Sequence, residues 1–253
     1  MLKIVSLGPG DSGYLAPRAK EALEEAEVVV GYSTYIDLLD PQMLKGKELI
    51  STGMKKEIER CRAAIRKSTE GKATAIVCSG DAGIYGMAGL ILELIEEDGL
   101  LESVEVEIIP GIPALCAAAA LLGAPLMHDF AVISLSDLLT PWELIRSRVE
   151  AGGAADYVIV LYNPKSRKRD WQIGAVRDIL LQHRPPDTPV GIVRNAMREN
   201  QDIRLTTLDE LADSPIDMLT IVIIGNSQTT ILGGKMVTPR GYKEKYGPFR
   251  STV

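Results

Sequence analysis

Short apolar runs rich in β-branched residues alternate along this chain with longer stretches in which apolar positions recur at helical spacing. This alternation is typical of an α/β protein. Most of the apolar runs are continuous, as expected for strands that are covered on both faces. The pattern predicts strands over residues 3–7, 27–31, 74–78, 104–109, 132–135, 157–161, 190–193 and 219–224. It predicts helices over residues 16–25, 55–69, 84–97, 113–122 and 141–151.

The pattern also indicates two α/β domains. Segment 123–126 interrupts it, and the second half contains a close strand pair around 191–195 and 202–206. We expect an N-terminal domain over residues 1–122 and a C-terminal domain over residues 126–240. Residues 241–253 are expected to form a polar tail.

Composition excludes several classes of function. A hydrophobic content of 46% allows a sizeable core, and a formal net charge of −6 argues against a nucleic-acid partner. The three cysteines are scattered and only two histidines are present, so we expect no metal site and a reducing compartment. No run of about 18 apolar residues occurs, and the start resembles no cleavable leader. A soluble, cytoplasmic protein without a membrane partner is therefore expected.

The turns after the predicted strands are where an α/β sheet collects its ligands. The first turn, Gly8-Pro9-Gly10-Asp11, allows close approach of the backbone to a ligand, although a simple tight turn explains it equally well. It is neither a P-loop nor a dinucleotide fingerprint. A second turn, residues 79–86, places Asp81 at a strand end. That carboxylate either accepts hydrogen bonds from a ligand or caps the next helix.

Three further turns have unusual composition. Residues 110–114 read Pro-Gly-Ile-Pro-Ala and precede a helix of small residues, whose alanines close packing alone would explain. Residues 161–165 read Leu-Tyr-Asn-Pro-Lys and end a strand. The last of these turns comprises two strand ends, residues 193–197 and 224–227. Met197 is expected to line a ligand site without taking part in the chemistry.

Taken in order, these turns resemble the tetrapyrrole methylase family, whose members open with Gly-Pro-Gly-Asp, continue with a Gly-Asp loop and then Pro-Gly-Ile. Other segments resemble the branch of that family that methylates C17 of precorrin-3B. They are residues 31–35 (GYSTY), 53–57 (GMKKE), 79–89 (SGDAGIYGMAG), 134–143 (SLSDLLTPWE), 161–164 (LYNP) and 238–242 (TPRGY). The resemblance covers nearly the whole chain.

The resemblance implies the two-domain tetrapyrrole methylase fold, with a mostly parallel sheet in the first domain, a mixed sheet in the second, and helices flanking both. It also implies a homodimer and S-adenosylmethionine bound in the cleft between the domains. The implied reaction is C17 methylation with ring contraction of precorrin-3B or cobalt-factor III, to precorrin-4 or its cobalt form, in cobalamin (vitamin B12) biosynthesis. S-adenosylhomocysteine is the second product. By position, the cofactor contacts would be Pro9, Ser79, Gly80, Asp81, Ile84, Pro113, Ala114, Asn163 and Ala196.

Methyl transfer from a reactive sulfonium mainly requires alignment of the acceptor carbon, whereas ring contraction also requires proton movement. Candidate acid or base groups are Asp11, Asp81, Asp137 and His128. His128 has two alternatives: contact with a substrate cobalt, or a local pairing with Asp129. The substrate's carboxylates are expected at Gly10, Lys165, Arg167, Arg194 and Arg240, although Lys165 and Arg167 fit a solvated helix start equally well.

Three other functions compete with this one. A sibling enzyme would methylate a different corrin carbon. A methyltransferase for ribosomal RNA or a translation factor would need a basic stripe, which the acidic balance disfavours. A non-catalytic module would bind S-adenosylmethionine without turnover.

Overall fold

The computed structural model describes residues 1–166 and 169–247. The chain divides into two compact units, unit 1 (Met1–Ala114) and unit 2 (Leu115–Val253). The division falls at the start of the helix that follows the fifth strand, whereas the sequence pattern placed the domain boundary after that helix. Within the described ranges, no helix is long and apolar enough to cross a membrane.

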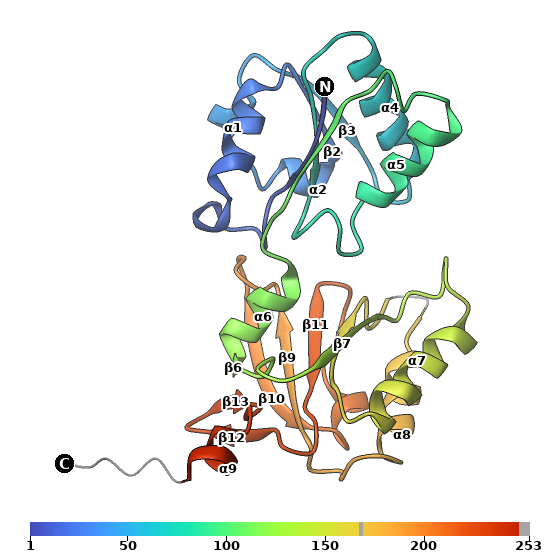
Figure 1. The fold of residues 1–253 in the computed structure, drawn as a ribbon. Coiled ribbons are helices and arrows are strands. Elements are labelled where there is room, and N and C mark those ends of the chain that lie inside the picture. The colour runs from blue at the N-terminus through green and yellow to red at the C-terminus, as the bar shows by residue number, and fades with distance from the viewer. Residues whose placement is uncertain (167–168, 248–253) are drawn as a thin grey trace, which may run out of the picture. The chain divides into compact units, whose positions relative to one another are not determined.

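Unit 1 is built on a five-stranded parallel sheet with the strand order β3-β2-β4-β1-β5 (Figure 1). Four of its strands overlap the predicted apolar runs. Strand β3 was not predicted, because this edge strand leaves Glu48, Leu49 and Ser51 exposed and so lacks an apolar run. The strands are β1 (Leu2–Ser6), β2 (Val28–Tyr32), β3 (Glu48–Thr52), β4 (Thr74–Cys78) and β5 (Val106–Ile109).

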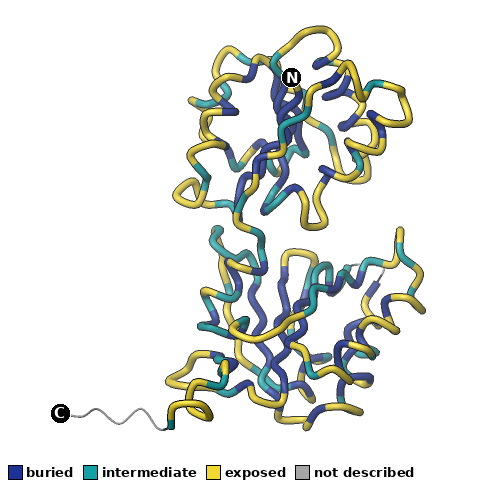
Figure 2. Tube along the Cα trace, in the orientation of Figure 1, coloured by how far each residue is buried: buried dark blue, intermediate teal, exposed yellow. Residues whose placement is uncertain are grey.

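Helices cover both faces of this sheet, and each face has its own core. On one face Ile4 packs with Cys61 and Ile91, and on the other Val5 packs with Leu23. The inner strands β2, β4 and β1 are accordingly buried, and the outer helix faces are exposed (Figure 2). The helical elements are η1 (Ser12–Tyr14), α1 (Pro17–Glu25), α2 (Ser33–Ile36), α3 (Pro41–Leu44), α4 (Glu57–Thr69) and α5 (Ala88–Glu97).

Helix α5 begins later than the sequence pattern predicted. The pattern started a helix at Ile84, but residues 84–87 form turns and bends. Tyr85 has a φ of 53°, which no residue of a right-handed helix adopts. The loop after β4 is therefore longer than expected.

Unit 2 contains a second five-stranded sheet, which is mixed as predicted. Its strand order is β10-β9-β11-β8-β7, with β7 parallel to β8, and with β11 antiparallel to both of its neighbours. Because of these pairings, the carboxyl ends of β7, β8 and β9 lie at one edge of the sheet. The strands are β7 (Phe130–Ser134), β8 (Val158–Tyr162), β9 (Pro189–Arg194), β10 (Asp202–Thr207) and β11 (Thr220–Ile224).

Helices α6 (Ala114–Leu122), α7 (Trp142–Ala154) and α8 (Gln172–Leu180) accompany this sheet, with the short η2 (Leu211–Asp213). The core of unit 2 gathers Ile159 and Leu161 of β8 with Ile145 of α7 and Val176 of α8. All four side chains are almost wholly buried. Strand β8 is therefore buried against helices α7 and α8.

The segment that interrupts the sequence pattern is itself a strand. β6 (Gly123–Ala124) pairs in parallel with β13 (Lys235–Val237), which pairs with β12 (Thr230–Leu232) in a small third sheet. Met236 is fully buried there. The polar tail beyond residue 240 begins with a helix, α9 (Tyr242–Tyr246).

Candidate functional site

The carboxyl ends of β1, β4 and β5 lie side by side in unit 1, and the loops that follow them make backbone contacts. The N–H of Gly8 donates to the carbonyl of Gly80 at 3.0 Å, and the N–H of Gly80 donates back at 2.7 Å. Both glycines have a positive φ, 70° and 68°, which a side chain would strain. The first and second predicted turns thus form one paired structure.

The third loop packs against this pair through Gly111. A Cβ atom on Gly111 would lie 2.5 Å from the carbonyl oxygen of Gly80 and 2.6 Å from the Cβ of Ser6. Such distances are essentially never seen for real Cβ atoms. The three loops are therefore in contact at a point that only glycine fits.

Asp81 connects the second loop to the third. Its Oδ1 accepts the N–H of Gly83 at 2.8 Å, and its Oδ2 accepts the N–H of Gly111 at 2.9 Å. The hydroxyl of Ser6 accepts the buried N–H of Ala82 at 2.9 Å. Asp81 does not cap the next helix, since α5 begins only at Ala88. Its carboxylate instead holds the shape of two loops.

Unit 1 thus gathers a large share of the predicted cofactor residues at one edge of its sheet. The Cβ that Gly80 lacks would lie 3.6 Å from the backbone nitrogen of Ala114 and 3.7 Å from the Cα of Pro113. Asp11 is exposed, and its Oδ1 accepts the N–H of Gly13 at 2.7 Å. The predicted residues on these loops are Pro9, Gly10, Asp11, Ser79, Gly80, Asp81, Ile84, Pro113 and Ala114.

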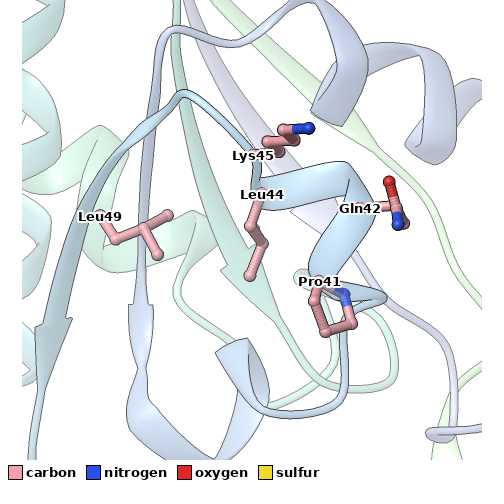
Figure 3. A pocket seen from close by; sticks show the side chains of 5 residues that line it. All are labelled: Pro41, Gln42, Leu44, Lys45 and Leu49. Carbon is pink, nitrogen blue, oxygen red and sulfur yellow. The ribbon is translucent and has the colours of Figure 1, made fainter.

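Unit 1 also has a shallow hollow between α3 and β3. It is lined by Pro41, Gln42, Leu44 and Lys45 of the α3 segment and by Leu49 of β3 (Figure 3). None of the predicted site residues lines it. A smaller hollow lies beside the first loop and is lined in part by Gly10 and Asp11.

In unit 2, Asn163 follows β8 at the carboxyl edge of the sheet. It has a φ of 50°, and its Nδ2 donates to the hydroxyl of Ser134, at the end of β7, at 3.0 Å. The buried Arg169 donates from Nη1 to the carbonyls of Asn163 and Leu135, both at 2.6 Å. Burial lowers the pKa of Arg169, and the nearby Asp137 carboxylate opposes that shift. Arg169 thereby fixes the Asn163 turn to the loop after β7.

Arg194 ends β9 at the same edge, and Ala196 follows it in the turn after the strand. This turn places Asn195 and Met197 at φ values of 51° and 57°, and such backbone strain is common at functional sites. Arg194 Nε donates to Asp217 Oδ2 at 2.6 Å, so this predicted substrate cation already has a carboxylate partner. Burial opposes ionisation of Asp217, but hydrogen bonds from Arg194, the Leu219 N–H and the Thr220 hydroxyl prevail and lower its pKa.

Two predicted residues of unit 2 lie away from this edge. His128 precedes β7, at the amino end of the strand, and its Nδ1 accepts the N–H of Asp129 at 2.8 Å. Arg240 lies two residues after Thr238, whose hydroxyl contacts the Thr229 hydroxyl in the turn after β11. Because β11 is antiparallel to β9, this turn lies at the opposite edge of the sheet. Unit 2 therefore does not bring Arg240 together with Arg194. Arg167 lies outside the described residues.

A buried cation of unit 1 was not predicted from the sequence. Arg60 of α4 is only 3% exposed. It donates to the Thr52 hydroxyl at 2.7 Å, and its guanidinium lies 5.7 Å from the centre of the Tyr32 ring. An arginine among the apolar positions of an amphipathic helix, next to Cys61, was the available signal.

Among the described residues, no group of His, Cys, Asp and Glu side chains could hold a metal ion.

The sequence and fold match those of known proteins. The family model described as "Tetrapyrrole (Corrin/Porphyrin) Methylases" matches residues 1–212. The "Probable cobalt-factor III C(17)-methyltransferase" of Salmonella typhimurium is 50% identical over 242 residues, which are 96% of this chain and 99% of that protein. The "Cobalt-factor III methyltransferase" of Priestia megaterium is 47% identical over 97% of this chain, which spans only 46% of that longer relative.

Solved structures agree with these relatives. The crystal structure of the methyltransferase CobJ has a TM-score of 0.88 at 34% identity, covering 94% of this chain and 99% of that one. Cobalt precorrin-4 methyltransferase CbiF has a TM-score of 0.71 at 23% identity, covering 88% and 94% of the two chains, and shares the fold. The α/β class predicted from the sequence is confirmed, with a parallel first sheet and a mixed second sheet.

Proposed function

The chain belongs to the tetrapyrrole methylase family, and from this we propose that it transfers a methyl group from S-adenosylmethionine to C17 of a corrin-pathway tetrapyrrole, with ring contraction. The observation that carries the proposal is the 50% identity to the Salmonella protein, a match that spans 96% of this chain and 99% of that protein. We propose cobalt-factor III as the substrate, because the relatives from Salmonella and Priestia are both named for it.

The residues of unit 1 fit the cofactor that this family uses. Three loops meet at Gly8, Gly80 and Gly111, where the absence of side chains lets the loop backbones pack and hydrogen-bond together, and we propose that this packing sets the shape of the cofactor site. Bound there, S-adenosylmethionine would supply an activated methyl group. Asp81 would keep the second and third loops in their binding shape, since each of its oxygens accepts a backbone N–H. Proposed contacts in unit 2 are Asn163 and Ala196.

For proton movement we propose Asp11 over the other three candidates. Asp81 and Asp137 use their carboxylates to hold loops, Asp137 by accepting Gln172 Nε2 at 2.8 Å. His128 is paired locally with Asp129. Asp11 also accepts a backbone N–H through Oδ1, but it is exposed in the first loop beside Gly10, whereas both oxygens of Asp81 accept backbone N–H groups. We further propose that the protein is a homodimer, which light scattering would test.

The test is incubation of the protein with carbon-13-methyl S-adenosylmethionine and, in parallel, cobalt-factor III or precorrin-3B, followed by NMR. Label at C17 of a contracted ring is the expected result with cobalt-factor III. Label at another carbon would identify a sibling activity. Turnover of precorrin-3B alone would replace the cobalt-bearing substrate by the metal-free one. The Asp11→Asn variant should bind S-adenosylmethionine as the wild type does and lose turnover.

A further inference from the structure

The loop between β7 and α7 carries two leucines that face the solvent. Leu138 is 78% exposed and Leu139 is 98% exposed. The loop projects beyond the helices of unit 2 in Figure 1, and its tip is exposed in Figure 2. Two adjacent large aliphatic side chains left in water are unfavourable, and such exposed apolar groups commonly mark a binding surface.

The base of this loop is held firmly. Asp137, next to Leu138, accepts a hydrogen bond from Gln172 Nε2 at 2.8 Å. The Leu135 N–H donates to the carbonyl of Tyr162 at 2.9 Å, and the Leu135 carbonyl accepts from Arg169. The two leucines are thus presented by a preorganised loop, which lowers the entropy cost of binding.

An aromatic pair lies at the same edge of the sheet. Trp142 begins α7 and Trp171 immediately precedes α8, with their ring centres 4.7 Å apart in an edge-to-face arrangement. They are the only two tryptophans of the chain. Trp171 is 52% exposed and is adjacent to Gln172, the residue that holds the leucine loop. We call Leu138, Leu139 and Trp171 the apolar platform.

We propose that the apolar platform contacts the flat face of the tetrapyrrole macrocycle, an inference that rests on the proposed function. A tetrapyrrole has apolar faces and a rim of carboxylates. The platform offers aliphatic and aromatic surface, and Lys165, at the same edge, offers a cation for the rim. Arg169 joins the platform loop to the turn of Asn163, which is a proposed cofactor contact. The macrocycle would therefore be held beside the cofactor residues of this unit.

The size of the platform favours this occupant over a second protein. A stable protein interface buries about 800 Å² on each partner. Three side chains supply only a small part of that area, so they fit a small flat ligand better than a second protein. A second copy of the chain is the alternative that the experiment must separate.

The test compares the Leu138→Ala/Leu139→Ala double variant with the wild type in the labelled-methyl assay. We expect the KM for cobalt-factor III to rise about 10-fold or more, because apolar contact area is lost. Affinity for S-adenosylmethionine, by calorimetry, should stay unchanged, and so should the unfolding midpoint, since both leucines are exposed. Leu101→Ala is the matched control, because Leu101 is 61% exposed in unit 1 and precedes β5, away from the carboxyl edge. It should leave the KM unaltered.

Each other outcome would overturn the inference in a recognisable way. If the wild type turns over and the double variant has the same KM for cobalt-factor III, the proposed function stands. The proposal that the apolar platform contacts the macrocycle is then wrong. A change in oligomeric mass, measured by light scattering, would identify the leucines as an interface between copies. A wild type that transfers no label to either tetrapyrrole would remove both proposals together.

Discussion

Replacing Gly111 by alanine should damage the cofactor site of unit 1 from within. The new Cβ would lie 2.5 Å from the Gly80 carbonyl oxygen, about 0.5 Å closer than the 3.0 Å below which real Cβ atoms essentially never approach. It would also lie 2.6 Å from the Ser6 Cβ and 3.2 Å from the Gly8 nitrogen. Both the Gly80 oxygen and the Gly8 nitrogen take part in the backbone pairing of the first two loops.

The magnitude follows from these contacts. Two of the three close atoms are backbone, so no flexible side chain can move away to make room. Overpacking of this kind costs about 1–3 kcal/mol. A distortion of about 1.4 kcal/mol at the loops corresponds to a tenfold loss of affinity. We therefore expect S-adenosylmethionine binding to weaken by about 10-fold or more.

The measurements are urea unfolding and calorimetric titration with S-adenosylmethionine. The matched control is Gly89→Ala in α5, where the added Cβ meets nothing within 4 Å. Alanine in a helix lowers the entropy of the unfolded chain, so this control should be more stable by about 0.4–1 kcal/mol and should bind normally. If Gly111→Ala matched the wild type in both stability and affinity, the contact between the three loops would have no role in binding.

Other perturbations test single interactions. Ser6→Ala removes the acceptor of a buried N–H and should lower the free energy of unfolding by about 1–3 kcal/mol in urea. Burial raises the pKa of the Cys61 thiol to about 12 and that of the Cys78 thiol to about 11. At pH 8 a thiol reagent should therefore label only the exposed Cys116 until the protein is unfolded. Asp217, whose pKa is lowered in the folded state, contributes stability above its unfolded pKa of about 3.9 and loses that contribution as the pH falls through its folded value. Unfolding curves of Asp217→Asn and the wild type should therefore differ at pH 7 and converge in acid.

The alternation of apolar runs and helices was sufficient to predict most strands of the two large sheets, because buried strands and amphipathic helices carry strong periodic signals. It failed at β3, where an edge position leaves polar side chains in the strand. It also placed the start of α5 too early, since the apolar Ile84 and Met87 belong to a turn and not to a helix face.

The site was less predictable than the fold. The turns after β1, β4 and β5 were identified as ligand-binding because strand order in a parallel sheet brings their ends together. The sequence does not indicate that β11 is antiparallel to its neighbours. The turn at 224–227 was therefore expected beside the turn after β9, although it lies at the opposite edge of the sheet. Arg60 was missed because a buried arginine is recognised only once its partners are in place.

The position of β11 also has a consequence for synthesis of the chain. It lies between β9 and β8, although it is the last strand of its sheet to leave the ribosome. Until residue 224 emerges, β8 and β9 each lack their common neighbour and present open edges. The sheet of unit 1 needs nothing beyond Ile109 and can close while translation continues. The two halves therefore mature at different times, and protection by a chaperone would matter most in the interval between them.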